Sequence, residues 1–237
     1  MRKGKKALTI VSLILFLGAL VFVSYQLFQV RTVTVVGCET RAPDEIIALS
    51  GISYNTSIFL VDKQRVEDAL SSDPRIKPID VEITYPDTVT LSIEERHPMA
   101  YIVKEGAYIV IDDESWVLEL LAEPPPTAYP QVTGLQADTV KVGAQIGTDD
   151  AFKIAVLKHV LHALTQTQTE VSEINLSYAV NISVRLSNGF TVKLGDDTGL
   201  EQKLKLASTV VNEMVNMGKT TGTVNVSSGK KAYYQEN

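Results

Sequence analysis

The chain has 237 residues, of which 45% are hydrophobic and 21% are charged, so a mainly disordered protein is excluded. Its single cysteine excludes a disulfide framework and a zinc site built from several cysteines. The net charge of −6 argues against a nucleic-acid-binding protein. This length suits one large domain or two small ones.

The first thirty residues differ in character from the rest. Residues 7–30 contain no charged side chain, and 7–28 would form a helix of about 33 Å, enough to cross a hydrocarbon core of about 30 Å. A cleaved signal peptide is the alternative, but its apolar region is shorter and ends at a small-x-small site, which 23–28 lack. We expect a tail over 1–6 and an uncleaved transmembrane helix over 7–30.

The charges that flank this segment predict its orientation. Four bases precede it, and Arg31 alone follows directly, so the N-terminus is expected in the cytoplasm and the remainder outside. Outside the cytoplasm, Cys38 could be a free thiol or form an intermolecular disulfide. We favour a third interpretation, in which Cys38 is simply a small buried residue at the end of a strand. The four bases are Arg2, Lys3, Lys5 and Lys6.

Residues 31–97 predict a small α+β domain of β-α-α-β-β order. Valine and threonine alternate over 32–37, which is typical of a strand. Pro43 suits an early helical position and Gly51 a helix end, and Asp62 suits the cap of a second helix that ends near 71. Two alternating strands follow over 80–85 and 88–94, so the helices should cover one face of the sheet.

Residues 98–227 predict a larger mixed β domain with flanking helices, followed by a C-terminal strand or tail over 228–237. Asp149 and Asp150 stand where a helix N-cap belongs, and Asn188-Gly189 predicts a type I′ hairpin turn. The expected strands are 101–103, 108–111, 116–121, 180–186, 190–194 and one or two closing strands over 223–227 and 231–234, with helices over about 152–164 and 200–217.

The candidate chemical motifs are weak, and we predict no catalytic residue, cofactor or metal. Gly218-Lys219-Thr220 resembles the end of a phosphate-binding loop but closes a helix instead of opening one. His159 and His162 lack a third metal ligand, and 112–114 is expected to be a solvated turn, not a calcium loop. A membrane-anchored extracytoplasmic cell-wall enzyme remains the alternative, and it would need a nucleophile–base pair or a metal set.

One string resembles a known family. Residues 85–100 read YPDTVTLSIEERHPMA, which is similar to the aromatic-Pro, alternating-strand, Glu-Arg-x-Pro-x-Ala passage of the bacterial division proteins FtsQ and DivIB. Weaker matches lie at 33–37, at 129–134 and from Asn188-Gly189 to Lys203-Leu204. Departures include Tyr85, where Trp is common, and Cys38, where Asn often follows the glycine.

The resemblance implies a short cytoplasmic tail, one transmembrane helix, a POTRA domain over 31–97 and a β domain. It also implies a non-catalytic scaffold at the division septum that bridges the single-span coiled-coil proteins FtsB (or DivIC) and FtsL and so influences septal peptidoglycan synthesis. In the family a partner segment adds as an extra strand to the last strands. By position these residues are Val224, Val226, Lys231, Ala232, Tyr233 and Tyr234. A plain closing strand with a frayed end is the alternative.

Overall fold

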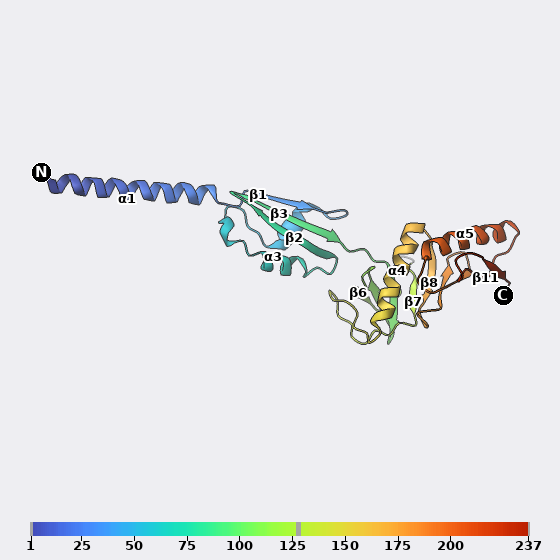
Figure 1. Ribbon diagram of the computed structural model, residues 1–237. Coiled ribbons are helices and arrows are strands. Elements are labelled where there is room, and N and C mark those ends of the chain that lie inside the picture. Colours follow the sequence, from blue (N-terminus) through green and yellow to red (C-terminus); the bar gives the residue numbers. More distant parts are fainter. Residues whose placement is uncertain (1, 127–128, 237) are drawn as a thin grey trace. The chain divides into compact units, whose positions relative to one another are not determined.

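The computed structural model describes residues 2–126 and 129–236, with side chains placed from residue 12 onward. The chain divides into two compact units, Met1–Glu95 and Arg96–Asn237 (Figure 1). Met1 and Asn237, at the ends of the predicted tail and C-terminal segment, lie outside the described residues.

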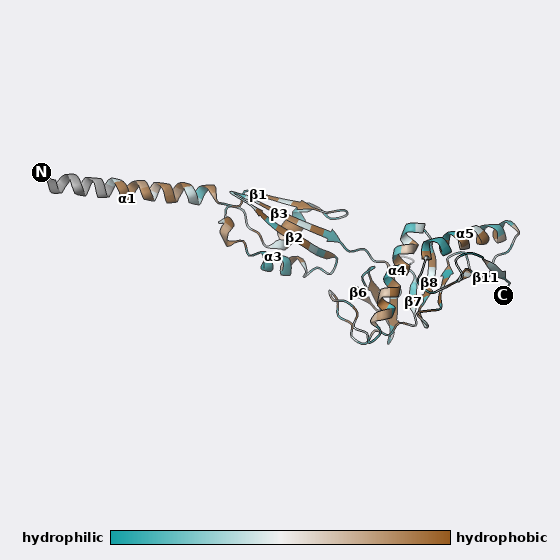
Figure 2. Cartoon of the chain, viewed as in Figure 1, coloured by the Kyte–Doolittle hydropathy of each residue, from teal (hydrophilic) through white to brown (hydrophobic). Residues whose placement is uncertain are grey.

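The N-terminal unit begins with one continuous helix, α1 (Arg2–Leu27). From residue 12 onward its surface is largely hydrophobic (Figure 2), and Leu15, Phe16 and Val21 are each more than 60% exposed. Within the described residues, no helix is both long enough and apolar enough to cross a membrane. The transmembrane helix expected over 7–30 is thus not confirmed, and the side chains of 7–11 lie outside those described.

A three-stranded sheet follows, in the order β1-β3-β2. The central strand β3 (Thr88–Glu95) pairs in parallel with β1 (Thr32–Val36) and antiparallel with β2 (Ile76–Thr84). Between β1 and β2 lie α2 (Pro43–Ser50), the short 3₁₀ turn η1 (Ile58–Leu60) and α3 (Lys63–Leu70). The β-α-α-β-β order predicted from the sequence is confirmed.

The start and end of α2 and the start of α3 lie at the residues predicted from the sequence. Pro43 starts α2, and Gly51 ends it in the left-handed region at φ 70°. The Asp62 carboxylate accepts a hydrogen bond from the Arg65 N–H at 3.3 Å and so caps α3. Apolar residues from these helices, the sheet, η1 and the segment before β1 form one core: Val30, Ile46, Ile58, Val66, Leu70, Ile76, Val81, Val89, Leu91 and Ile93.

The Glu95 carboxylate, at the end of β3, holds the loop that follows β1. It is 8% exposed and accepts hydrogen bonds from the backbone N–H groups of Glu39, Thr40 and Arg41 at 2.9–3.2 Å and from the Thr40 hydroxyl. Burial raises the pKa of Glu95, but these hydrogen bonds outweigh burial and bring the pKa down from 4.5 to about 2. The ionised carboxylate therefore fastens a loop more than fifty residues away in sequence.

The second unit is built on a nine-stranded sheet in the order β12-β11-β10-β9-β8-β7-β4-β5-β6. Most neighbours are antiparallel, while β4–β7, β7–β8 and β10–β11 are parallel. The strands are β4 (Ala100–Lys104), β5 (Ala107–Ile111), β6 (Val117–Leu121), β7 (Gln131–Thr133), β8 (Val171–Asn175), β9 (Ile182–Leu186), β10 (Phe190–Gly195), β11 (Gly222–Asn225) and β12 (Tyr233–Gln235).

Two helices, α4 (Ala151–Thr167) and α5 (Leu200–Asn216), pack against each other and on this sheet (Figure 1). Asp150 caps α4 through the Lys153 N–H at 3.1 Å, as the sequence predicts. The buried residues of the two helices belong to the same hydrophobic core as strand residues such as Phe190 and Val192, which are fully buried. The unit is therefore a mixed β domain with flanking helices.

The hairpin between β9 and β10 differs from the prediction in two ways. Val180 is 71% exposed and lies in a turn closed by the Asn181 N–H and the Tyr178 carbonyl at 2.9 Å, so β9 begins only at Ile182. Gly189 has φ 95°, but Asn188 is not among the residues with positive φ, which a type I′ turn requires at both central positions. The connection is instead a three-residue loop with glycine in the left-handed position.

The turn over 112–114, expected to be solvated, is anchored in the interior. Asp112 is 1% exposed and forms an ion pair with Arg96, which also contacts Glu114 at 3.0 Å and lies 4.4 Å from the centre of the Trp116 ring. The Asp112 carboxylate also accepts the N–H groups of Glu114 and Trp116 at 2.9 and 2.7 Å. Burial raises the pKa of Asp112 above its usual value despite these partners. This segment is therefore a structural anchor of the second unit.

Replacing Glu95 with Gln should lower the free energy of unfolding of the N-terminal unit by about 1–3 kcal/mol at pH 7, because the amide cannot serve all the donors of the loop. Since the folded pKa of about 2 lies below 4.5, the carboxylate stabilises the native state above pH 4.5 and loses this effect as the pH falls towards 2. The variant should lack that part of the pH dependence.

Hydrogen exchange of peptides from β3, followed at increasing urea concentrations, measures the unfolding free energy of the N-terminal unit by itself. Glu94→Gln is the matched control, because the Glu94 side chain is 60% exposed. Equal unfolding free energies for the two variants would contradict the anchoring role of Glu95.

Candidate functional site

The candidate site lies at one edge of the nine-stranded sheet. β11 pairs in parallel with β10, and β12 folds back antiparallel on β11, with Tyr234 opposite Val224 and Tyr233 opposite Asn225. In the described part of the chain, β12 is the outermost strand on this side. One side of its backbone therefore faces no strand of the same chain, and such an edge is a template for pairing.

The six residues that the sequence proposes for partner binding fall into two groups. Val224 and Val226 are fully buried in the core of the unit. β11 is also enclosed between β10 and β12, so a partner strand has no access to it while β12 is in place. These two valines therefore lie in the core behind β12 and are not accessible from the edge.

The other four residues lie at the accessible edge. Tyr233 is 63% exposed, Lys231 is exposed, and Ala232 and Tyr234 are partly buried against the core. The turn before β12 is held by Ser228, whose hydroxyl accepts the Lys231 N–H at 3.3 Å. The structure thus brings the four together on β12 and its approach, and Tyr233 presents the largest exposed apolar surface among them.

Gly222 fixes the position of β12, and the sequence analysis missed it. A Cβ atom at this position would lie 2.3 Å from the ring of Tyr234, and its φ of 149° also favours glycine. The Tyr234 ring therefore covers the backbone of β11, while its hydroxyl donates to the Thr221 carbonyl at 3.0 Å. The signal in the sequence was a glycine at the start of a predicted strand, which often marks a close approach of another group.

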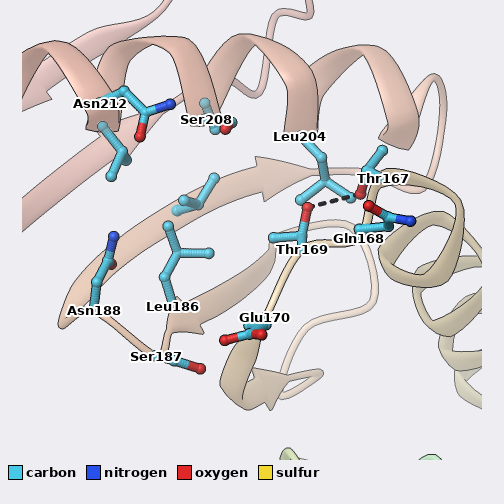
Figure 3. A pocket seen from close by; sticks show the side chains of 13 residues that line it. Thr167, Gln168, Thr169, Glu170, Leu186, Ser187, Asn188, Leu204, Ser208 and Asn212 are labelled. Atoms are coloured by element: carbon cyan, nitrogen blue, oxygen red, sulfur yellow. Dashed lines mark hydrogen bonds between the residues drawn. The ribbon is translucent and has the colours of Figure 1, made fainter.

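One hollow of this unit, away from the β12 edge, offers little chemistry. A cavity of about 280 Å³ lies where the end of α4 and the start of β8 meet the β9–β10 hairpin and α5 (Figure 3). Glu170 is the one ionisable residue that lines it, and the hydroxyls of Thr167 and Thr169 bond to each other at 2.7 Å. The two hydroxyls thus bond to each other and not to the Glu170 carboxylate, whereas a hydroxyl nucleophile needs a paired base to activate it.

His159 and Lys219 each pair with an acidic side chain. His159 Nδ1 lies 2.8 Å from an oxygen of Asp197, and the His159 side chain is 60% exposed. Lys219 donates to Glu236 at 2.7 Å, next to the end of α5, where an anion would meet the negative end of the helix. Among the residues that the structure describes, no group of three or more metal-ligating side chains comes together.

Comparison with known proteins matches both units. The model of the FtsQ-type POTRA domain matches residues 28–96, and the model of the C-terminal domain of the cell division proteins FtsQ and DivIB matches residues 100–228.

Individual relatives agree with these matches. The chain is 26% identical to cell division protein DivIB of Clostridium tetani over 84% of this chain and 76% of that protein. It is 27% identical to cell division protein FtsQ of Chloroflexus aurantiacus over 87% of this chain and 76% of that protein. It is 23% identical to cell division protein DivIB of Clostridium botulinum over 99% of this chain and 94% of that protein. Since the C-terminal model alone spans more than half of the sequence and the POTRA model matches residues 28–96 before it, this chain belongs to the FtsQ/DivIB family of cell division proteins.

Proposed function

We propose that this protein is a non-catalytic scaffold of the division site. It binds and bridges two small coiled-coil membrane proteins, of the FtsB/DivIC and FtsL types, and through them helps to control septal peptidoglycan synthesis. Membership of the FtsQ/DivIB family supports a role in division. The open edge of β12 is the observation that carries the partner-binding part of the proposal.

Binding at this edge works by addition of a strand. An extended partner segment satisfies the outward N–H and C=O groups of β12, which supplies affinity without a deep pocket. Tyr233 provides an exposed aromatic anchor beside the pairing groups, and aromatic side chains are frequent energetic centres of interfaces. Lys230 and Lys231 are exposed and attract acidic partner residues.

Tyr233→Ser should weaken binding of a purified complex of the two coiled-coil proteins by about 30-fold, the loss typical of an interfacial aromatic anchor. Truncation after Gly229 should abolish binding, because it removes β12. The measurement is a titration of the full-length chain in detergent by calorimetry.

Tyr178→Ser is the matched control, since Tyr178 is 71% exposed and lies in the loop between β8 and β9. Unchanged affinity for both the truncated chain and Tyr233→Ser would place the partner site elsewhere. Absence of binding by the unaltered chain would contradict the scaffold function itself.

Gly222→Ala should release β12 while β12 remains in the chain, because the new methyl group would collide with the Tyr234 ring. We expect faster hydrogen exchange over 230–236 and weaker partner binding. Gly106→Ala carries a similar backbone strain at φ 84°, but no atom lies within 4 Å of the added group. Equal exchange over 230–236 in the two variants would show that the ring contact does not hold the edge.

The proposal also places the protein at the cell membrane, attached through α1 with its N-terminus in the cytoplasm and both units outside. The exposed apolar side chains of α1 support attachment to lipid, since a helix that is hydrophobic all round needs an apolar environment. The basic residues that precede the apolar run support the orientation.

Impermeant thiol reagents test this orientation in intact cells that carry Cys38→Ser. A cysteine placed by Ser228→Cys should react, and one placed by Gly4→Cys should react only after lysis. The reverse pattern would overturn the orientation.

A further inference from the structure

Three segments that are far apart in the sequence form the end of the N-terminal unit that receives α1. The chain leaving α1 is bonded to the loop before η1, through the Val30 N–H with the Thr56 carbonyl at 2.8 Å and the Ile58 N–H with the Phe28 carbonyl at 2.9 Å. The Arg31 N–H also bonds to the Asp87 carbonyl, in the turn between β2 and β3, at 2.9 Å. This end is therefore fixed to the fold by backbone hydrogen bonds.

Each of the three segments contributes an aromatic ring to the surface of this end. The ring centres of Phe28 and Phe59 are 5.1 Å apart, those of Phe59 and Tyr85 5.5 Å, and those of Phe28 and Tyr85 6.3 Å. Phe59 is 63% exposed, Tyr85 57%, and the adjacent Leu60 80%. We call Phe28, Phe59, Leu60 and Tyr85 the aromatic end.

The outward direction of these side chains is set by the core. Ile58 is fully buried, and it anchors η1 so that the next two residues of this tight turn point away from the core. Phe59, Leu60 and Tyr85 are therefore exposed, while Phe28 is partly buried against the core and packs on the Phe59 ring. A group of exposed apolar side chains of this kind marks a contact surface.

The surroundings of the aromatic end suit a lipid surface. Leu27, the last residue of α1, is 50% exposed and directly precedes Phe28, so the apolar surface of the helix continues into the domain. The nearby acidic side chains are engaged locally, Asp62 with the Arg65 N–H and Asp87 with the Thr88 hydroxyl. Tyr85 is amphipathic, the character that concentrates at the boundary between acyl chains and headgroups, and the exposed Phe59 and Leu60 beside it add apolar surface.

We propose that the aromatic end is a lipid-docking surface that inserts into the headgroup region of the membrane to which α1 is attached. This inference rests on the membrane attachment proposed above. Docking at two adjoining elements, α1 and the aromatic end, fixes the tilt of the N-terminal unit against the bilayer. A single helix joined to a freely moving domain would not do so.

The test uses the full-length chain with Cys38→Ser, in nanodiscs of phosphatidylethanolamine and phosphatidylglycerol. A nitroxide label is attached at Leu60→Cys or, as the control, at Val36→Cys. Val36 is 54% exposed and lies at the far end of β1, roughly 13 Å from its start. Collision with oxygen, which is enriched in lipid, is compared with collision with a water-soluble nickel complex.

The label at position 60 should favour oxygen at least about 10-fold more than the label at position 36. Equal, water-like accessibility at both positions, in chains that have entered nanodiscs, would overturn the docking surface and leave the membrane attachment intact. Chains that do not enter nanodiscs at all would contradict the attachment.

A second measurement separates lipid from protein as the occupant. A photo-crosslinking amino acid at position 60 in growing cells should give no protein adduct, because the surface faces lipid. A discrete adduct with another protein, or with a second copy of this chain, would overturn the lipid assignment.

Discussion

The hydrogen bonds that the Glu95 carboxylate accepts from the loop after β1 are the constraint on which the N-terminal unit depends. They join the end of the central strand to residues 39–41 and so close the sheet against its helices. The next residue, Arg96, makes the corresponding anchor for the second unit through Asp112. Glu95 is itself buried and accepts hydrogen bonds from a loop of the first unit, whereas Arg96 pairs with the buried Asp112 of the second unit, so each unit keeps its own anchor.

The two surfaces proposed for binding work by different physics. The edge of β12 offers backbone hydrogen bonds, whose strength depends on the alignment of a strand that Gly222 and Tyr234 hold in place. The aromatic end offers apolar area, whose value depends on Phe59 and Leu60, the two exposed residues that follow the buried Ile58. Neither needs a cavity or a reactive group, which agrees with a scaffold that acts by holding other molecules.

Local patterns predicted most elements but not their limits. Helix caps at Pro43, Asp62 and Asp150 lie where expected because capping depends on neighbours in the sequence. The alternation around Val180 was extended too far, since a turn tolerates the same residue types as the strand that follows. The short β7 and β8, which join the two halves of the sheet, were not predicted at all, because β7 has only three residues and the two buried residues of β8, Val171 and Ile174, do not alternate.

The sequence by itself determined the type and order of most strands and helices, the family, and the position of the closing strands near the C-terminus, because periodicity, caps and characteristic strings are local. Only the tertiary structure decided which strand is the edge, since strand order depends on the crossover through α5 and on pairing between distant segments. It also separated the buried Val224 and Val226 from the exposed Tyr233, and brought Phe28, Phe59 and Tyr85 together. Burial and proximity are set by long-range packing, which no local pattern encodes.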